Sequence, residues 1–539
     1  MKPFISLVVL TSGLALIGAT PVPSDDRMIV HVLNRVAFGP RAGDVDRVKA
    51  IGVQRYIDEQ LHPERIPDAA MSARLSGLTT LGMSSREIAE TYEIPQLQAR
   101  REKKQEAAQA SMSDAAKPPA MPDPLQQKAN RVVIELAEQK MLRAVYSDRQ
   151  LQEVLTDFWF NHFNVDARKG PDRFLLTEYE RDVIRPHVLG KFRDLLEATA
   201  KSPAMLFYLD NWMSADPNGP HPGTGLGGRA RGDLPPPGRG ARGRFGVIMP
   251  PRPRPSPQGK NASKGLNENY GRELMELHTL SVDGGYTQKD VTEVARAFTG
   301  WTIQNPRLGG GFRFEPRIHD TGEKIVLGHV IKSGGEGDGE QVLDILAKHP
   351  STARFIATKL VRRFVSDTPP PSLVDRAAAR FRETDGDLRE VTRTILTSPE
   401  FFSPEAYRAK VKTPFEFVAS ALRATGADVQ DATPLVRTMQ QLGMPLYMCQ
   451  PPTGYKDTAD AWVNTGALVN RMNFSLTLAS NKLPGVVVDS LQSQVDSQSF
   501  TRAILGDDVS ETTRSTVAKA TSAPQMAALT LGAPEFQRR

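Results

Sequence analysis

Amphipathic helical segments follow one another along almost the whole chain, and this pattern restricts the fold more than any other feature. Near the start, Ile29, Val32 and Val36 repeat at helical spacing, and Gly39-Pro40 ends that helix. The same periodicity returns in later segments, among them 125–146, 148–164, 173–186, 190–200, 267–280 and 410–426. The sequence therefore predicts a mainly α protein, with a single large multi-helix domain over residues 25–480 and a C-terminal helical extension over 481–539.

Three stretches depart from this helical pattern. Residues from about 100 to 124 are charged and then rich in Ala and Pro, and residues 216–264 are rich in Gly, Pro and Arg. Neither stretch has enough apolar side chains to order itself, so both are expected to be disordered insertions in one domain. Apolar residues alternate between 312 and 328 around a His-Asp-Thr-Gly turn, which predicts one small β-hairpin there.

The N-terminus has the pattern of a secretory signal peptide over residues 1–20. An apolar run from Phe4 to about Ile17 is followed by small residues, and it is shorter than the ~20 residues of a membrane span. An uncleaved N-terminal anchor is the alternative. Cys449 is the only cysteine, so the chain has no intrachain disulfide. We expect a protein that is exported to the periplasm or the extracellular space.

The net charge of +6 does not indicate a nucleic-acid-binding protein, because the insertion at 216–264 supplies many of the arginines and no aromatic residues interleave with them. After removal of the signal peptide, no segment is apolar enough to cross a membrane. The sequence therefore predicts neither a nucleic-acid partner nor a transmembrane segment.

The stretch from Leu266 to Ile303 collects more acids, amides and turn residues than any other part of the chain. On its first helix, Asn267 and His278 project within a narrow arc, as residues that line a cleft would. Arg272 lies on the opposite flank, where it also fits an ordinary surface ion pair with Glu276. Together with other segments, this stretch predicts a set of cleft-lining side chains: Asn161, Asn267, Asn269, Arg272, Asp283, Tyr286, Asp290, Trp301 and Lys324.

The loop inside this stretch has two interpretations. Gly284-Gly285 turns the chain, and Thr287 with Asp290 fits a capping box at the start of the next helix. The spacing of Thr279, Asp283 and Asp290 also resembles a helix–loop–helix calcium site, but Thr279 and Asp290 stand where Asp and Glu are expected. Capping is the favoured interpretation.

Two other segments carry histidines that could join this stretch. His162, beside Asn161, falls on or next to the buried face of the 148–164 helix. It is either a core histidine bonded to a backbone carbonyl or a metal ligand or general base. His319-Asp320 forms a turn followed by Lys324, where Asp320 either makes the turn or contributes to a functional loop.

Several motifs resemble a bacterial family called domain of unknown function 1800. They include DFWFNHFNV, NENYGRELMELHTLSVDGGYTQKDV, ARAFTGW, TDGDLREVTRTILTSPEF and PPTGY, and they cover most of residues 28–480. The resemblance implies an exported, mainly helical protein that is often encoded beside a protein related to sulfatases and alkaline phosphatases. It also implies a His-x-His pair on the 148–164 helix, where this chain has Phe160 instead of the first histidine.

Three functions fit these residues. The first is a metal-dependent hydrolase of an envelope or extracellular substrate, with metal ligands His162, His278, His319 and Asp320 and catalytic roles for His162, His278, Glu268 and Glu273. Zinc or calcium would be the divalent metal. The second is a non-catalytic accessory protein that partners the co-encoded sulfatase- or phosphatase-like protein. The third is a redox protein with non-covalent haem, since no CxxCH motif is present.

Overall fold

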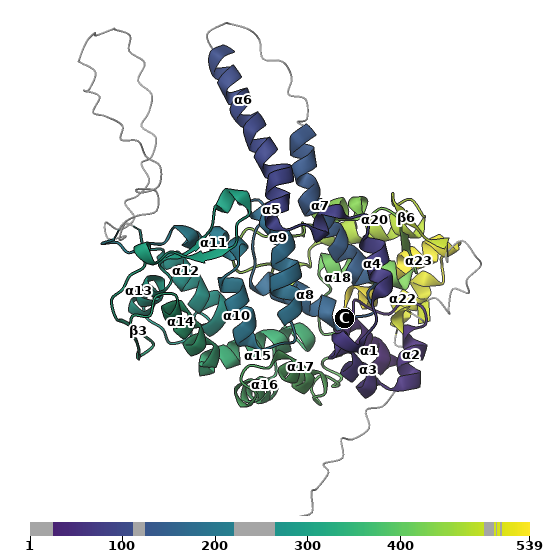
Figure 1. Ribbon diagram of the computed structural model, residues 1–539. Helices are drawn as coiled ribbons and strands as arrows, with labels where there is room; N and C mark the ends of the chain where they lie inside the picture. Colours follow the sequence, from purple (N-terminus) through teal and green to yellow (C-terminus); the bar gives the residue numbers. More distant parts are fainter. Residues whose placement is uncertain (1–24, 111–123, 220–264, 490–500, 503, 507–508) are drawn as a thin grey trace, which may run out of the picture.

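The computed structural model describes residues 25–110, 124–219, 265–489, 501–502, 504–506 and 509–539. Helices dominate these residues, which confirms the predicted mainly α class (Figure 1). The N-terminal half contains α1 (Asp26–Val36), α2 (Asp44–Ile51), α3 (Val53–Gln60), α4 (Ala69–Leu75), α5 (Ser85–Ile88), α6 (Ile94–Ala110), α7 (Pro124–Tyr146), α8 (Gln150–His162), α9 (Asp172–Glu178), α10 (Phe192–Ala200) and α11 (Pro203–Tyr208).

The C-terminal half is also mainly helical. Its helices are α12 (Glu268–Glu273), α13 (Gln288–Ala297), α14 (Gly337–Lys348), α15 (Pro350–Phe364), α16 (Pro371–Glu383), α17 (Leu388–Leu396), α18 (Pro414–Ala424), α19 (Thr433–Gln441), α20 (Thr465–Ala479), α22 (Glu511–Val517), α23 (Ala523–Gly532) and α24 (Pro534–Gln537). A π-helical segment, Leu274–Leu280, directly continues α12. None of the described helices is both long and apolar enough to cross a membrane.

One hydrophobic core joins the two halves, running from Ile29 in α1 to Phe536 in α24. Residues at the far end of the sequence therefore pack into the same core as the first helices. Lys410 and Arg539 exchange two backbone hydrogen bonds, which hold the last residues against the segment before α18. In Figure 1 the first helices, in purple, and the last helices, in yellow, lie on the same side of the molecule.

Short strands make up the small β content of the described residues, and their pairing corrects the predicted hairpin. β1 (Trp301–Ile303) pairs with β2 (Phe312–Phe314), and β3 (Lys324–Val326) pairs with β4 (His329–Ile331). The reason is the Leu327-Gly328 turn, whose φ angles of 49° and 80° suit a two-residue hairpin and pair β3 with β4 instead of β2. A third pair joins β5 (Asp428–Val429) to β6 (Val486–Val487).

The first part of the stretch predicted to be an insertion is helical. Residues 100–110 belong to α6, because their Glu, Lys, Gln and Ala side chains are strong helix formers. Figure 1 shows α6 and the start of α7 projecting together from the body. Residues 111–123, most of the second predicted insertion (220–264) and the predicted signal peptide lie outside the described residues.

Candidate functional site

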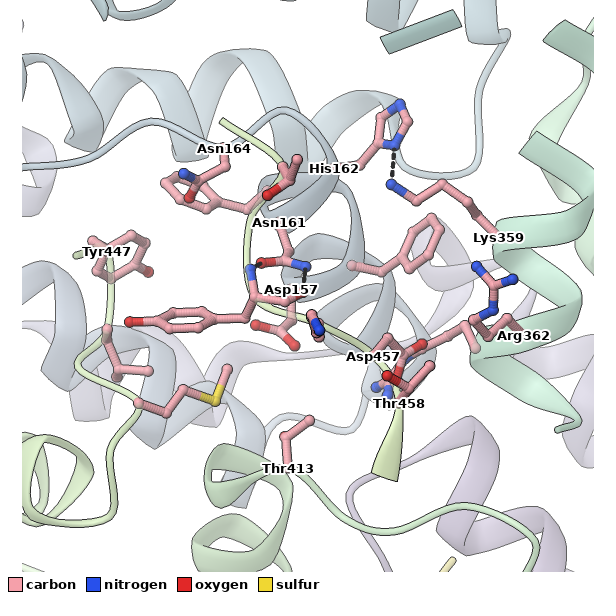
Figure 2. Close-up of a pocket in the computed structure, with 18 of the residues that line it drawn as sticks. Asp157, Asn161, His162, Asn164, Lys359, Arg362, Thr413, Tyr447, Asp457 and Thr458 are labelled. Atoms are coloured by element: carbon pink, nitrogen blue, oxygen red, sulfur yellow. Dashed lines mark hydrogen bonds between the residues drawn. The ribbon is translucent and has the colours of Figure 1, made fainter. Parts of the chain in front are cut away.

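A cavity of about 250 Å³ lies between α8, α15 and the segment from Met444 to Thr458 (Figure 2). Asp157, Asn161 and His162 reach it from α8. Its remaining walls come from α7, α15, the N-cap of α18 and the 444–458 segment, and they include Lys140, Lys359, Arg362, Arg363, Thr413, Tyr447, Tyr455, Lys456 and Asp457. We call it the central cavity.

Two amides next to the end of α8 hold the 444–458 segment in place. The Asn161 side chain donates to the carbonyl of Tyr455 at 2.8 Å and accepts from the Tyr455 N–H at 2.7 Å. Asn164 donates to the carbonyls of Cys449 and Pro451, both at 2.9 Å. Gly454 allows this approach because it has φ +71°, and a Cβ there would lie 2.2 Å from the Asn161 carbonyl oxygen. The motifs NHFN and PPTGY therefore form one wall together.

His162 and Lys359 form a hydrogen-bonded pair at the cavity. The Nε2 of His162 lies 3.1 Å from the carbonyl of His278, and the Nδ1 lies 2.8 Å from the Lys359 amine. A carbonyl only accepts, so Nε2–H donates to it, and Nδ1 must then accept from Lys359. Figure 2 shows the two side chains facing each other. Both sequence-based interpretations of His162 thus describe part of its environment: it is bonded to a carbonyl and it faces a cavity.

The electrostatics of this pair follow from burial. Burial and the neighbouring Lys359 hold the pKa of the His162 imidazole well below its ordinary value, so it is neutral. Burial lowers the pKa of the Lys359 amine to about 8, an effect that Asp457 partly opposes and Arg362 reinforces. An amine with a pKa near neutrality, facing a cavity, is a frequent property of functional lysines.

His278 lies close to His162, with 6.3 Å between the ring centroids. It sits on the π-helical segment and packs against Phe163, and burial lowers its pKa to about 3. The structure thus brings two of the predicted metal ligands together. Their contact runs through the His278 backbone carbonyl, and the His162 Nδ1 is occupied by Lys359.

Behind the cavity lies a buried cluster with more cations than anions. Its buried basic side chains are Arg35, Arg363, Lys410, Lys412, Arg471 and Arg539, and the acidic groups nearest to them are Glu416, Asp457 and Asp367. Burial lowers the pKa of Lys412 to about 7 and that of Arg471 to about 10, as expected where positive charge is not fully compensated. Arg363 and Asp457 belong both to this cluster and to the cavity wall.

Another part of the cavity wall is electrically balanced. Lys140 and Asp157 form an ion pair at 2.7 Å, with both side chains largely buried. The Lys140 ammonium also lies over the rings of Phe160, Phe415 and Tyr447, at 5.5, 5.3 and 5.1 Å from their centroids. A histidine in place of Phe160 would therefore contribute an imidazole to this wall.

His319 and Asp320 belong to a separate buried network. The Nδ1 of His319 lies 2.8 Å from the Thr299 carbonyl, and its Nε2 lies 3.1 Å from Asp338, which also accepts from Lys324 at 2.6 Å. Asp320 pairs with Arg296 through both carboxylate oxygens, at 2.7 and 3.0 Å. These bonds use the groups that would bind a metal and tie the 319–324 loop to α13 and α14.

Several of the other predicted site residues in the 266–303 stretch cap or cross-link helical segments. Asn267 caps α12, and Glu268 and Arg272 bond to Gln288 of α13 at 2.9 and 2.6 Å. Tyr286 donates to Glu276 at 3.1 Å. Trp301 is fully buried, Asn269 and Asp283 are exposed, and Glu273 is half-buried with a pKa raised by burial. These contacts explain the polar density of the stretch.

The loop of this stretch follows the capping interpretation. Thr287 and Asp290 form the complete capping box of α13, and Asp290 also accepts from the Leu327 N–H at 2.8 Å. The Thr279 hydroxyl is buried and donates to the Leu274 carbonyl at 2.8 Å. Across the described parts of the chain, no group of three or more His, Cys, Asp or Glu side chains is placed to hold a metal ion.

Sequence reasoning missed Lys359, Arg362 and Asp457. A signal for Lys359 was present, since Lys359 and Arg363 both lie next to Ile356 and Leu360 on the apolar side of α15, where cations are unusual. Nothing local to α15, however, indicates that this face meets α8 and the 444–458 segment.

Comparison with known proteins identifies the family of the chain but no activity. No curated protein matches the chain, and neither does any solved structure. The family model described as "Protein of unknown function (DUF1800)" matches residues 31–538, which is nearly the whole chain and includes both the central cavity and the last helices. The chain therefore belongs to the DUF1800 family of proteins of unknown function.

Proposed function

We propose that the protein binds a small anionic molecule in the central cavity and that Lys359 exchanges a proton with it. The observation that carries this proposal is the position of Lys359: its amine faces the cavity, donates to the neutral His162 and has a pKa of about 8. Among the described residues, neither Lys359 nor Arg362 forms an ion pair with a carboxylate, so both charges can act on a ligand.

The buried cluster behind the cavity supports an anionic ligand over a neutral one. It contains six basic and three acidic side chains, and its members Arg363 and Asp457 form part of the wall. An anion in the cavity would offset part of this excess, whereas a neutral ligand would leave it unchanged. The volume of about 250 Å³ suits a molecule the size of a sugar acid or a small phosphate or sulfate ester.

An amine and an imidazole in contact are suited to proton transfer. A base is most effective when its pKa lies near the working pH, and a pKa of about 8 meets that condition. With Lys359 as base, a hydrolytic or proton-abstracting reaction would not need the four ligands predicted from the sequence, which the fold distributes between two networks. Export through residues 1–20, to the periplasm or beyond, is part of the proposal, and the ligand would then be an envelope or extracellular molecule.

A second candidate is an accessory role beside a sulfatase- or phosphatase-like protein. The cationic surroundings of the cavity favour it, because a sulfate or phosphate ester would be a ligand of the right charge for both proteins. In that case the protein would bind the ester without converting it. The haem hypothesis finds less support, since charged and amide side chains line much of the cavity.

Binding is tested by calorimetry with sulfate, phosphate, glucuronate and uncharged glucose. We expect at least one anion to bind, glucose not to bind, and Lys359→Met to abolish binding. The matched control is Lys348→Met, at an exposed lysine of α14 outside the cavity, which should bind like the wild type. Equal binding of glucose and glucuronate, or unchanged binding by Lys359→Met, would overturn the proposal.

Elemental analysis of the purified protein tests the metal-dependent alternative. A stoichiometric divalent metal that is lost when His278 and His319 are both changed to Ala would favour the metal site over Lys359. Retention of the anion affinity in the same double variant would favour Lys359.

A further inference from the structure

A second and larger cavity, of about 490 Å³, lies where α7 meets α9 and α19. This volume is within the ~300–1,000 Å³ of small-molecule sites. Its inner wall is aliphatic and consists of Val133, Ile134 and Ala137 from α7, Val436 from α19, and Leu446 and Met448. This inner wall therefore offers an aliphatic surface, which would favour a hydrocarbon chain.

Two arginines at the rim of this cavity have neutral hydrogen-bond partners. Arg173 donates to the Gln96 side chain, and Arg100 donates to the Gln126 side chain at 2.6 Å. Gln96 in turn donates to Gln126 at 2.6 Å, so a pair of amides connects the two guanidinium groups. The buried Nε of Arg173 has no hydrogen-bond partner among the described residues.

The charge at this rim is not balanced. Burial and the nearby Arg100 lower the pKa of Arg173, and Glu93, which acts in the opposite direction, does not outweigh them. Arg168, at the same rim, differs because both oxygens of Asp166 accept from it, each at 2.9 Å. Arg100 and Arg173 thus donate to neutral amides, whereas Asp166 neutralises Arg168.

We propose that this second cavity binds a single-chain anionic amphiphile, such as a fatty acid, with its head group on Arg100 and Arg173 and its alkyl chain along the aliphatic wall of α7. The charge of the two arginines fits an anionic head, and the aliphatic wall fits one chain. An anion without a chain would leave the aliphatic wall in contact with water, and an uncharged chain would leave the arginines uncompensated.

The test is calorimetry of the purified full chain with dodecanoate below its micellar concentration. Acetate and dodecyl maltoside serve as probes that lack the chain and the charge. The Arg100→Gln, Arg173→Gln double variant should bind dodecanoate about tenfold more weakly, and Ile134→Trp should block the chain by filling the cavity. Arg168→Gln, the matched control, should stay within about twofold of the wild type because Asp166 already neutralises that arginine.

Each outcome decides for or against the proposal. The site would be established if dodecanoate binds more strongly than acetate and dodecyl maltoside, if its binding weakens about tenfold in the double variant, and if Ile134→Trp blocks it. Equal binding of dodecyl maltoside, equal losses in Arg168→Gln and the double variant, or binding only to vesicles of anionic phospholipid would overturn it. Circular dichroism spectra that match the wild type show that each variant is folded.

Discussion

Replacement of Gly454 by Ala tests how the wall of the central cavity is built. Gly454 has φ +71°, and a Cβ there would come within 2.2 Å of the Asn161 backbone oxygen. The left-handed conformation costs a residue with a Cβ about 1 kcal/mol. The overlap also forces the segment away from α8, which breaks the two Asn161–Tyr455 hydrogen bonds, at about 1 kcal/mol each. We expect a total loss of about 3 kcal/mol in the free energy of unfolding.

Gly443→Ala is the matched control, because Gly443 has φ +83° and a Cβ there meets nothing within 4 Å. It should lose only the conformational contribution of about 1 kcal/mol. Urea denaturation followed by far-ultraviolet circular dichroism measures the free energy of unfolding of both variants. Calorimetry with the anion of the central cavity measures whether the cavity wall still supports binding. If the two variants lose equal stability, or if Gly454→Ala keeps the wild-type anion affinity, the contact with Asn161 does not shape the cavity.

Three further predictions concern the buried charges. Lys359→Met should raise stability at pH 7 by about 3 kcal/mol, because the pKa of this amine falls from 10.5 in the unfolded chain to about 8 in the folded protein. The wild type gains stability as the pH rises from 8 to 10.5, since the folded protein loses the proton first. Urea denaturation of both proteins across that pH range should therefore show the stability difference shrinking. Glu416→Gln should lower stability by about 3 kcal/mol at neutral pH, since it breaks the buried ion pairs with Arg363 and Arg539. Because these pairs lower the pKa of the Glu416 carboxyl, the loss should diminish in denaturation curves at acid pH. His319→Asn should lower the free energy of unfolding by about 2 kcal/mol in urea denaturation, because it disturbs the contact with Asp338. Calorimetry should show unchanged anion binding by this variant. A parallel loss of binding would place His319 in the anion site.

Individual helices and their caps were predictable because they depend on residues that are close together in the sequence. The capping box of Thr287 and Asp290 and the helical spacing in α1 and α8 follow from residues within a few positions of one another. The hairpin near 312–328 was mispredicted for a related reason: alternation fixes which face a strand presents but not which strand it joins, and the Leu327-Gly328 turn decided the pairing.

The candidate site was only partly predictable. His162 and Asn161 were recognised, because their own helix shows that they border its buried face. Lys359 and Asp457 reach the same cavity only through tertiary packing. Lys359 stands out beside the apolar residues of α15, but nothing local to that helix indicates that this face meets α8 and the 444–458 segment. The polar residues around Asn267 cap and cross-link helices, and the sequence alone does not distinguish this role from a functional site, since catalysis and helix capping use the same side chains.

The contact between Asn161 and Tyr455 joins positions 294 residues apart. Contacts this distant in sequence require the closure of a very long loop, and they form after local helices are in place. We therefore expect the central cavity to form late in folding and to be lost first on partial unfolding. In a urea titration, affinity for the anion should disappear before the helical signal does, so ligand binding would report whether the chain has completed its tertiary structure.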